Sequence, residues 1–84
     1  MFLAAQVSIY PLHQPQLSPV IDKALGIFRQ HGLGVTPGSM SSVVSGDDGE
    51  LFAAIKEAFQ QTSEQGEMVM IITLSNACPV PSQS

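Results

Sequence analysis

The chain has 84 residues, with three basic side chains against seven acidic ones and a formal net charge of -4. Binding to nucleic acid requires clustered cations that neutralise phosphates, and three scattered cations argue against that class of function. A chain of this length forms one small domain, expected over residues 1–84. Its apolar stretches are too short to span a bilayer, so no membrane insertion is expected.

Cysteine usage and hydrophobic content predict the cellular location and the oligomeric state of the protein. Cys78 is the single cysteine, which fits a reducing compartment, and no secretion signal is recognisable, so we expect a cytoplasmic location. Hydrophobic residues make up 44% of the chain and charged residues only 12%. Because a domain this small buries a limited core, the excess apolar surface predicts a homo-oligomer, at least a dimer.

The first half of the chain predicts a strand and a helix. Residues 2–10 alternate between apolar odd positions and more polar even positions, which is the period of a strand with one buried face, and Pro11 ends it. Ser18 is predicted to cap a helix that has Pro19 at its first position. The apolar face of this helix is formed by Val20, Ile21, Ala24, Leu25 and Phe28.

The second half predicts two short strands, a helix and a last strand. Turn residues around short β-prone pieces indicate strands near residues 33–39 and 40–45. Asp47 is predicted to cap the second helix, with Glu50 completing a capping box, and Gly66 ends the helix after about residue 65. Its predicted apolar face is Leu51, Phe52, Ile55, Ala58 and Phe59. The stretch "MVMIITLS" is a strand that is apolar on both faces at its start.

The element order βαββαβ predicts an α+β, ferredoxin-like fold. In this fold two helices cover one face of a four-stranded antiparallel sheet, and the first and third strands lie in its middle. The two-sided apolar character of the last strand indicates that the other sheet face is covered as well, most simply by a second subunit.

No constellation of side chains predicts catalysis, so we expect the protein not to be an enzyme. A nucleophilic or metal-bound Cys78 would need His13 or His31 beside it, and the sequence does not bring these residues together. We interpret the cysteine as a small structural thiol at the end of the last strand. The acidic residues at 47–50 are explained by their place at a helix N-terminus. No metal and no cofactor are expected.

Hydroxyl groups remain as the candidate site. The predicted topology sets the end of the first strand beside the start of the third, so Ser8 and Tyr10 are expected near Ser41 and Ser42. Hydroxyls and backbone amides that converge beside an aromatic ring suit a neutral, flat heterocycle rather than a reaction.

Three motifs, "VSIYPL" at 7–12, "MSSVVSGD" at 40–47 and "TLSNACP" at 73–79, together resemble the YkoF-type thiamine- and hydroxymethylpyrimidine-binding domain. The resemblance covers residues 5–79. It implies a paired ferredoxin-like domain with a non-catalytic role, the cytoplasmic binding of thiamine or its hydroxymethylpyrimidine moiety in vitamin B1 precursor uptake or salvage.

The resemblance also implies that Ser8, Ile9 and Tyr10 lie at the pocket wall. Together with Ser41 and Ser42, which the predicted strand pairing brings near, they are the expected ligand-binding residues. At Ser42 the family usually has Thr, and at Ser45 it often has a charged residue. Two alternatives stay open beside a thiamine-binding protein: an enzyme that uses Cys78, and a structural or regulatory oligomeric module without a small-molecule ligand.

Overall fold

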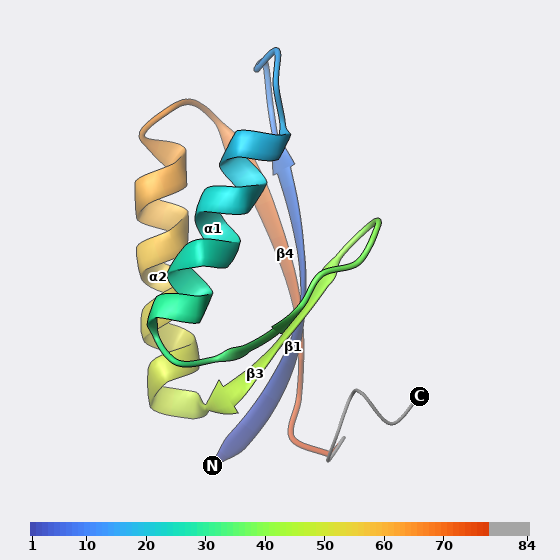
Figure 1. The fold of residues 1–84 in the computed structure, drawn as a ribbon, viewed down its shortest axis with the longest axis vertical. Coiled ribbons are helices and arrows are strands. Elements are labelled where there is room, and N and C mark those ends of the chain that lie inside the picture. Colours follow the sequence, from blue (N-terminus) through green and yellow to red (C-terminus); the bar gives the residue numbers. More distant parts are fainter. Residues whose placement is uncertain (78–84) are drawn as a thin grey trace.

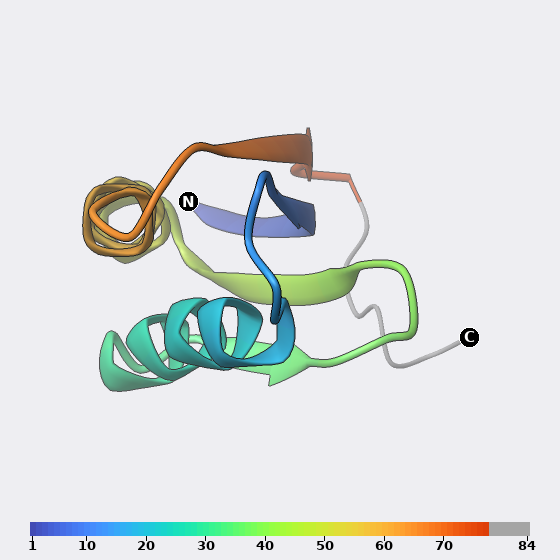
Figure 2. The same ribbon diagram turned by 90° about the horizontal axis from the view of Figure 1, so that it is seen from above.

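A four-stranded antiparallel sheet carries both helices on one of its faces (Figures 1 and 2). The computed structural model describes residues 1–77, so the expectations for Cys78 lie outside the described residues. The elements are β1 (Phe2–Pro11), α1 (Ser18–Gln30), β2 (Gly34–Thr36), β3 (Ser42–Asp47), α2 (Asp48–Ser63) and β4 (Met68–Ser75). The sheet order β2-β3-β1-β4 places the first and third strands in the middle. The predicted ferredoxin-like fold is confirmed.

The core lies between the helices and the side of the sheet that faces them. Side chains at odd positions of β1 point into it, and Ala5 and Val7 are only 1% and 2% exposed. From α1, Ala24 and Phe28 are fully buried against these residues. The alternation in β1 therefore has the predicted effect, because it gives the strand one buried face.

Helix α2 buries a different stripe from the one predicted. Its buried residues are Leu51, Ala54, Ala58 and Thr62. Phe52 and Phe59, which were predicted to face the core, are 50% and 41% exposed, so that part of the prediction is wrong. The buried stripe contains the small residues Ala54 and Ala58, while the bulkier phenylalanines stay on the flank.

The helix starts differ in how well the sequence predicted them. Asp47 caps α2 as expected and accepts a hydrogen bond from the Gly49 amide at 3.2 Å. Glu50 does not complete a capping box; its carboxylate faces His31 instead. In α1 the N-cap is Leu17 without a side-chain hydrogen bond, and the predicted cap Ser18 is the first helical residue.

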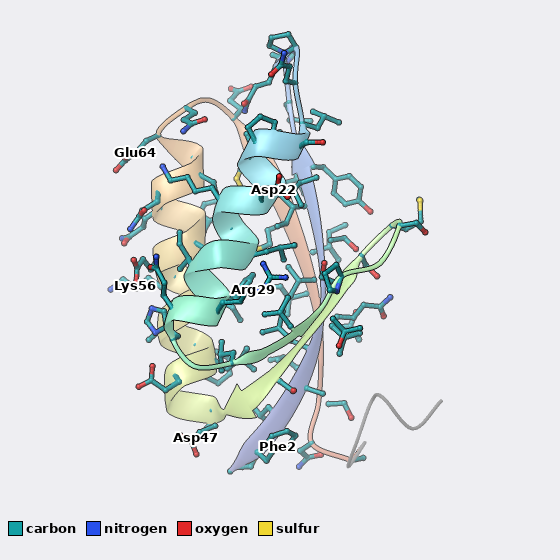
Figure 3. All side chains as sticks on the ribbon, viewed as in Figure 1. Phe2, Asp22, Arg29, Asp47, Lys56 and Glu64 are labelled. Atoms are coloured by element: carbon teal, nitrogen blue, oxygen red, sulfur yellow. The ribbon has the colours of Figure 1, made fainter. Side chains whose placement is uncertain are left out.

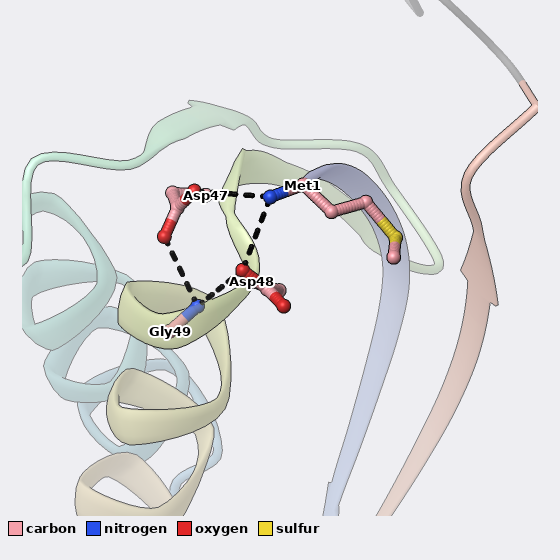
Figure 4. A network of polar contacts seen from close by, with 4 residues as sticks. All are labelled: Met1, Asp47, Asp48 and Gly49. Carbon is pink, nitrogen blue, oxygen red and sulfur yellow. Dashed lines mark hydrogen bonds and ion pairs between the residues drawn. The ribbon is translucent and has the colours of Figure 1, made fainter.

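The chain start is fastened to the first turn of α2. The Met1 ammonium lies 3.3 Å from a carboxylate oxygen of both Asp47 and Asp48 (Figure 4). The hydrogen bonds that the Met1 ammonium donates to these two carboxylates raise the pKa of the ammonium, and the bond to Asp48 lowers the pKa of that carboxyl group. The Asp48 amide also donates to the Met1 carbonyl oxygen at 2.8 Å. These contacts join the start of β1 to the junction of β3 and α2.

The face of the sheet away from the helices has no helix over it in residues 1–77 (Figure 2). Large apolar side chains are exposed there: Tyr10 (43%), Val69 (43%) and Ile71 (54%). Charged side chains such as Asp22, Arg29, Lys56 and Glu64 are carried by the helix layer (Figure 3). We call the sheet face away from the helices, formed by β1, β3 and β4, the uncovered face.

Candidate functional site

A shallow pocket lies where the end of β1, the start of β3 and helix α1 meet. It is lined by Val7, Ile9, Ile21, Gly38, Ser39, Met40, Ser41 and Ser42, and we call it the serine pocket. Its volume is about 60 Å³, well below the roughly 300–1,000 Å³ of a typical ligand pocket. It therefore has room for one part of a flat ligand, and the rest of that ligand would lie against the rim.

The strands supply the floor of the pocket through their register. Val7 of β1 is paired with Ser42 of β3, and both side chains are buried, at 2% and 7% exposure. Ile9 lies two residues further along β1, so it has the same orientation as Val7 and packs on the edge of the core. The floor is thus one hydroxyl next to two branched apolar side chains.

The loop between β2 and β3 supplies the rim, and its conformation requires a glycine at position 38. A Cβ at Gly38 would collide with the carbonyl oxygen of Ser41, so only glycine fits there. On the uncovered face, the Gln6 side-chain amide donates to Ser41 Oγ at 2.9 Å. The loop is therefore tied to β1 at the point where it enters β3.

Three of the residues predicted from the sequence come together in the serine pocket: Ile9, Ser41 and Ser42. The structure adds Val7, Ile21, Gly38, Ser39 and Met40 to the lining. The apolar wall had a signal in the sequence, because the odd positions of β1 were already predicted to share a face. The loop residues had no such signal.

Ser8 and Tyr10 do not line the pocket. Both occupy even positions of β1, so they lie on the uncovered face, where Ser8 is paired with Ile71 and Tyr10 with Val69 of β4. The sequence thus predicted which strand ends lie side by side, and the structure divides the predicted residues between the two faces of the sheet.

The chemistry of the lining suits binding. None of the residues around the serine pocket has an ionisable side chain, so the pocket holds no general acid or base that could activate a serine hydroxyl. Among residues 1–77, no group of histidine, cysteine and carboxylate side chains is arranged to hold a metal ion. Hydroxyls and branched apolar walls can hold a neutral ring by hydrogen bonds and by contact with its faces.

A separate polar cluster joins the two helices. His31, at the end of α1, lies with Nδ1 2.9 Å from Glu50 Oε1 and with Nε2 2.7 Å from Glu57 Oε1. Gln61 donates to the other oxygen of Glu57 at 2.8 Å. Only a doubly protonated ring donates to both carboxylates, and these hydrogen bonds, that of Glu57 first, raise the pKa of His31.

The His31 cluster predicts a pH-dependent stability. Because the folded-state pKa lies above the unfolded value of about 6.5, the stabilisation is complete below that value and is lost as the pH rises through the folded-state pKa. Urea denaturation from about pH 6 to about pH 9 should show a falling free energy of unfolding. His31→Gln should remove this part of the slope, whereas His13→Gln, on a ring that is 83% exposed, should keep it. An unchanged slope in His31→Gln would contradict the assignment.

The sequence profile of the thiamine-binding protein family matches residues 5–75. The chain belongs to this family. The match spans β1 to β4 and includes the whole serine pocket. No curated protein matches the chain.

Solved structures similar to this chain include a hypothetical protein from Methanocaldococcus jannascii. It is 28% identical, with a TM-score of 0.83 over 92% of this chain and 81% of that one. A domain of unknown function from Bacillus cereus is 23% identical, with a TM-score of 0.75 over 89% and 75% of the two chains. A Thermotoga maritima protein, proposed to act in thiamine biosynthesis or salvage, is 18% identical, with a TM-score of 0.78 over 89% and 83%. The last two likenesses show the fold alone.

Membership of the thiamine-binding protein family supports a small-molecule ligand and a binding role. Neither helix within residues 1–77 is long and apolar enough to cross a bilayer.

Proposed function

We propose that this protein binds thiamine, or its hydroxymethylpyrimidine moiety, in the serine pocket without transforming it. The observation that carries the proposal is the lining itself, in which the buried Ser42 stands beside apolar walls and no side chain is ionisable. The name given to the Thermotoga maritima protein is consistent with this role. We place the function in the cytoplasm, in the uptake or salvage of vitamin B1 precursors.

The proposed ligand is unphosphorylated. Phosphate groups in proteins are bound by arginine, lysine or clustered backbone amides, and no lysine or arginine lines the serine pocket. The net charge of -4 also repels an anionic ligand. Thiamine and its pyrimidine alcohol therefore fit this pocket better than thiamine diphosphate does.

Calorimetric titration of the whole chain tests the proposal. Thiamine and hydroxymethylpyrimidine should each give saturable heat and a rise in melting temperature, since a ligand that binds the native state stabilises it. Thiamine diphosphate should bind at least about tenfold more weakly, the equivalent of one lost charge-assisted contact. The absence of heat and of a thermal shift with both unphosphorylated compounds would disprove the proposed function.

A homo-oligomer, at least a dimer, belongs to the same proposal, with a second copy on the uncovered face. The support is chemical, because exposed Tyr10, Val69 and Ile71 form an apolar surface on a sheet that has no helix over this face in residues 1–77. Sedimentation velocity at micromolar concentration should show a species larger than the monomer.

The uncovered face also favours a second candidate function, an oligomeric interaction module without a small-molecule ligand. Titration separates the two functions: assembly in the absence of any ligand-induced heat would favour the module. A monomer at micromolar concentration would count against it.

A further inference from the structure

Met40 lies on the rim of the serine pocket and is 81% exposed. It is the most exposed large apolar side chain of the described residues; Met1 follows at 69%. Single apolar side chains on a surface are ordinary. Met40 differs because it borders a pocket whose other apolar walls, Val7, Ile9 and Ile21, are buried or half-buried.

The loop presents Met40 from a constrained backbone. Gly38 allows a close approach to the Ser41 carbonyl group that no other residue would allow. Ser41, directly after Met40, is held by the Gln6 hydrogen bond of 2.9 Å. The loop is thus tied to β1 through the residue next to Met40, while the methionine side chain is 81% exposed and has three rotatable bonds.

The size of the pocket leaves a ligand in need of cover. A cavity of about 60 Å³ can take in only part of a heteroaromatic ring, so the rest of the ring would lie at the rim with a face uncovered. A flexible thioether at that place can lie over the exposed face, because sulfur makes favourable contacts with aromatic rings at about 5 Å.

We propose that Met40 is a specificity-determining residue that closes over the face of a bound aminopyrimidine ring. This inference rests on the proposed function, since it concerns the same pocket. The Ser42 hydroxyl contacts a polar atom at the ring edge, whereas Met40 contacts the ring face. The pocket therefore selects flat heteroaromatic ligands over non-aromatic ligands with the same polar groups.

Methyl NMR tests the contact directly. The chain has four methionines, so labelling their methyl groups with ¹³C gives a small set of signals, and Met40→Leu assigns the one at the pocket. Titration with thiamine and with hydroxymethylpyrimidine should shift the Met40 signal upfield through the ring current, in a saturable manner. The signal of Met68, which is buried in the protein at 8% exposure, is the internal control and should stay in place.

Affinities of variants provide the second test. Met40→Ala should weaken binding of both compounds by about tenfold, through the lost sulfur–ring contact and the lost apolar cover. Met40→Leu should stay within about threefold of the original affinity, because it restores the apolar cover. Leu17→Ala, at a 48% exposed residue that does not line the pocket, is the matched control and should bind normally.

The outcomes distinguish this inference from the proposed function. If the unmodified protein binds neither compound, the proposed function fails and the inference fails with it. If that protein binds but the Met40 signal stays fixed and Met40→Ala binds normally, the inference alone is overturned. A Met40 signal that moves on dilution and ignores the ligand would assign the side chain to a contact between subunits, which also overturns it.

Discussion

Phe28→Ala is expected to lower the free energy of unfolding by about 3–5 kcal/mol. Phe28 is 0% exposed and belongs to the core cluster that joins α1, α2 and the sheet. Its removal leaves a cavity that the surrounding alanines and leucines cannot fill, so the lost transfer free energy and the lost contacts add. Since a typical domain has a total stability of only about 5–15 kcal/mol, urea denaturation followed by circular dichroism should show a much earlier transition.

Phe52→Ala is the matched control for this variant. It deletes the same atoms from a side chain that is 50% exposed on the flank of α2. The free energy of unfolding should therefore fall by less than about 1 kcal/mol. Equal losses of stability in the two variants would contradict the assignment of the core.

These two phenylalanines show how far the sequence predicts this fold. The helical period correctly predicted that α2 is amphipathic, because apolar residues recur every three to four positions along it. It did not predict which side of the helix is buried. Phe52 directly follows Leu51, so both fit the same apolar stripe, but only Leu51 is buried in the core. That choice depends on how α2 packs on the shared core, in which Ala54 and Ala58 are fully buried. Such packing is a tertiary property.

The helix starts illustrate a second limit. At Asp47 the predicted cap is confirmed. The backbone of this residue is extended at the end of β3, with φ -67° and ψ 143°, and its carboxylate can therefore reach the Gly49 amide. At Ser18 the helix begins one residue earlier, since Leu17 already has helical dihedral angles. Side-chain chemistry identifies a helix start to within a residue or two, and the incoming backbone decides the position of the cap.

The sequence predicted which strand ends lie side by side, but not on which face of the sheet each candidate residue lies. Strand order and direction brought the end of β1 to the start of β3, as the pairing of Val7 with Ser42 shows. The face depends on the parity of each residue along its strand, so Ser8 and Ser42 were assigned to one site although they lie on opposite faces. The sequence of the loop that carries Met40 has no periodic pattern. The position of this loop beside the pocket is therefore seen only in the folded structure.

Ser42→Leu is expected to abolish binding of thiamine and hydroxymethylpyrimidine, with at least a hundredfold loss of affinity. Ser42 is 7% exposed and lines a pocket of about 60 Å³, so the leucine side chain can find room only in the space that the ligand would occupy. Overfilling at such a position typically costs about 1–3 kcal/mol of stability. Circular dichroism and a thermal melt therefore accompany the calorimetric titration, to show that the variant is folded.

Ser8→Leu is the matched control, and it decides which face of the sheet binds the ligand. It introduces the same side chain at another of the serines predicted from the sequence, which lies on the neighbouring strand but on the uncovered face, opposite Ile71. Binding should stay within about threefold of the original affinity, the effect of a side chain that makes no ligand contact. The reverse pattern, with binding lost in Ser8→Leu and kept in Ser42→Leu, would move the site to the uncovered face. Tyr10 would then become its aromatic wall, and a second copy of the chain on that face would compete with the ligand.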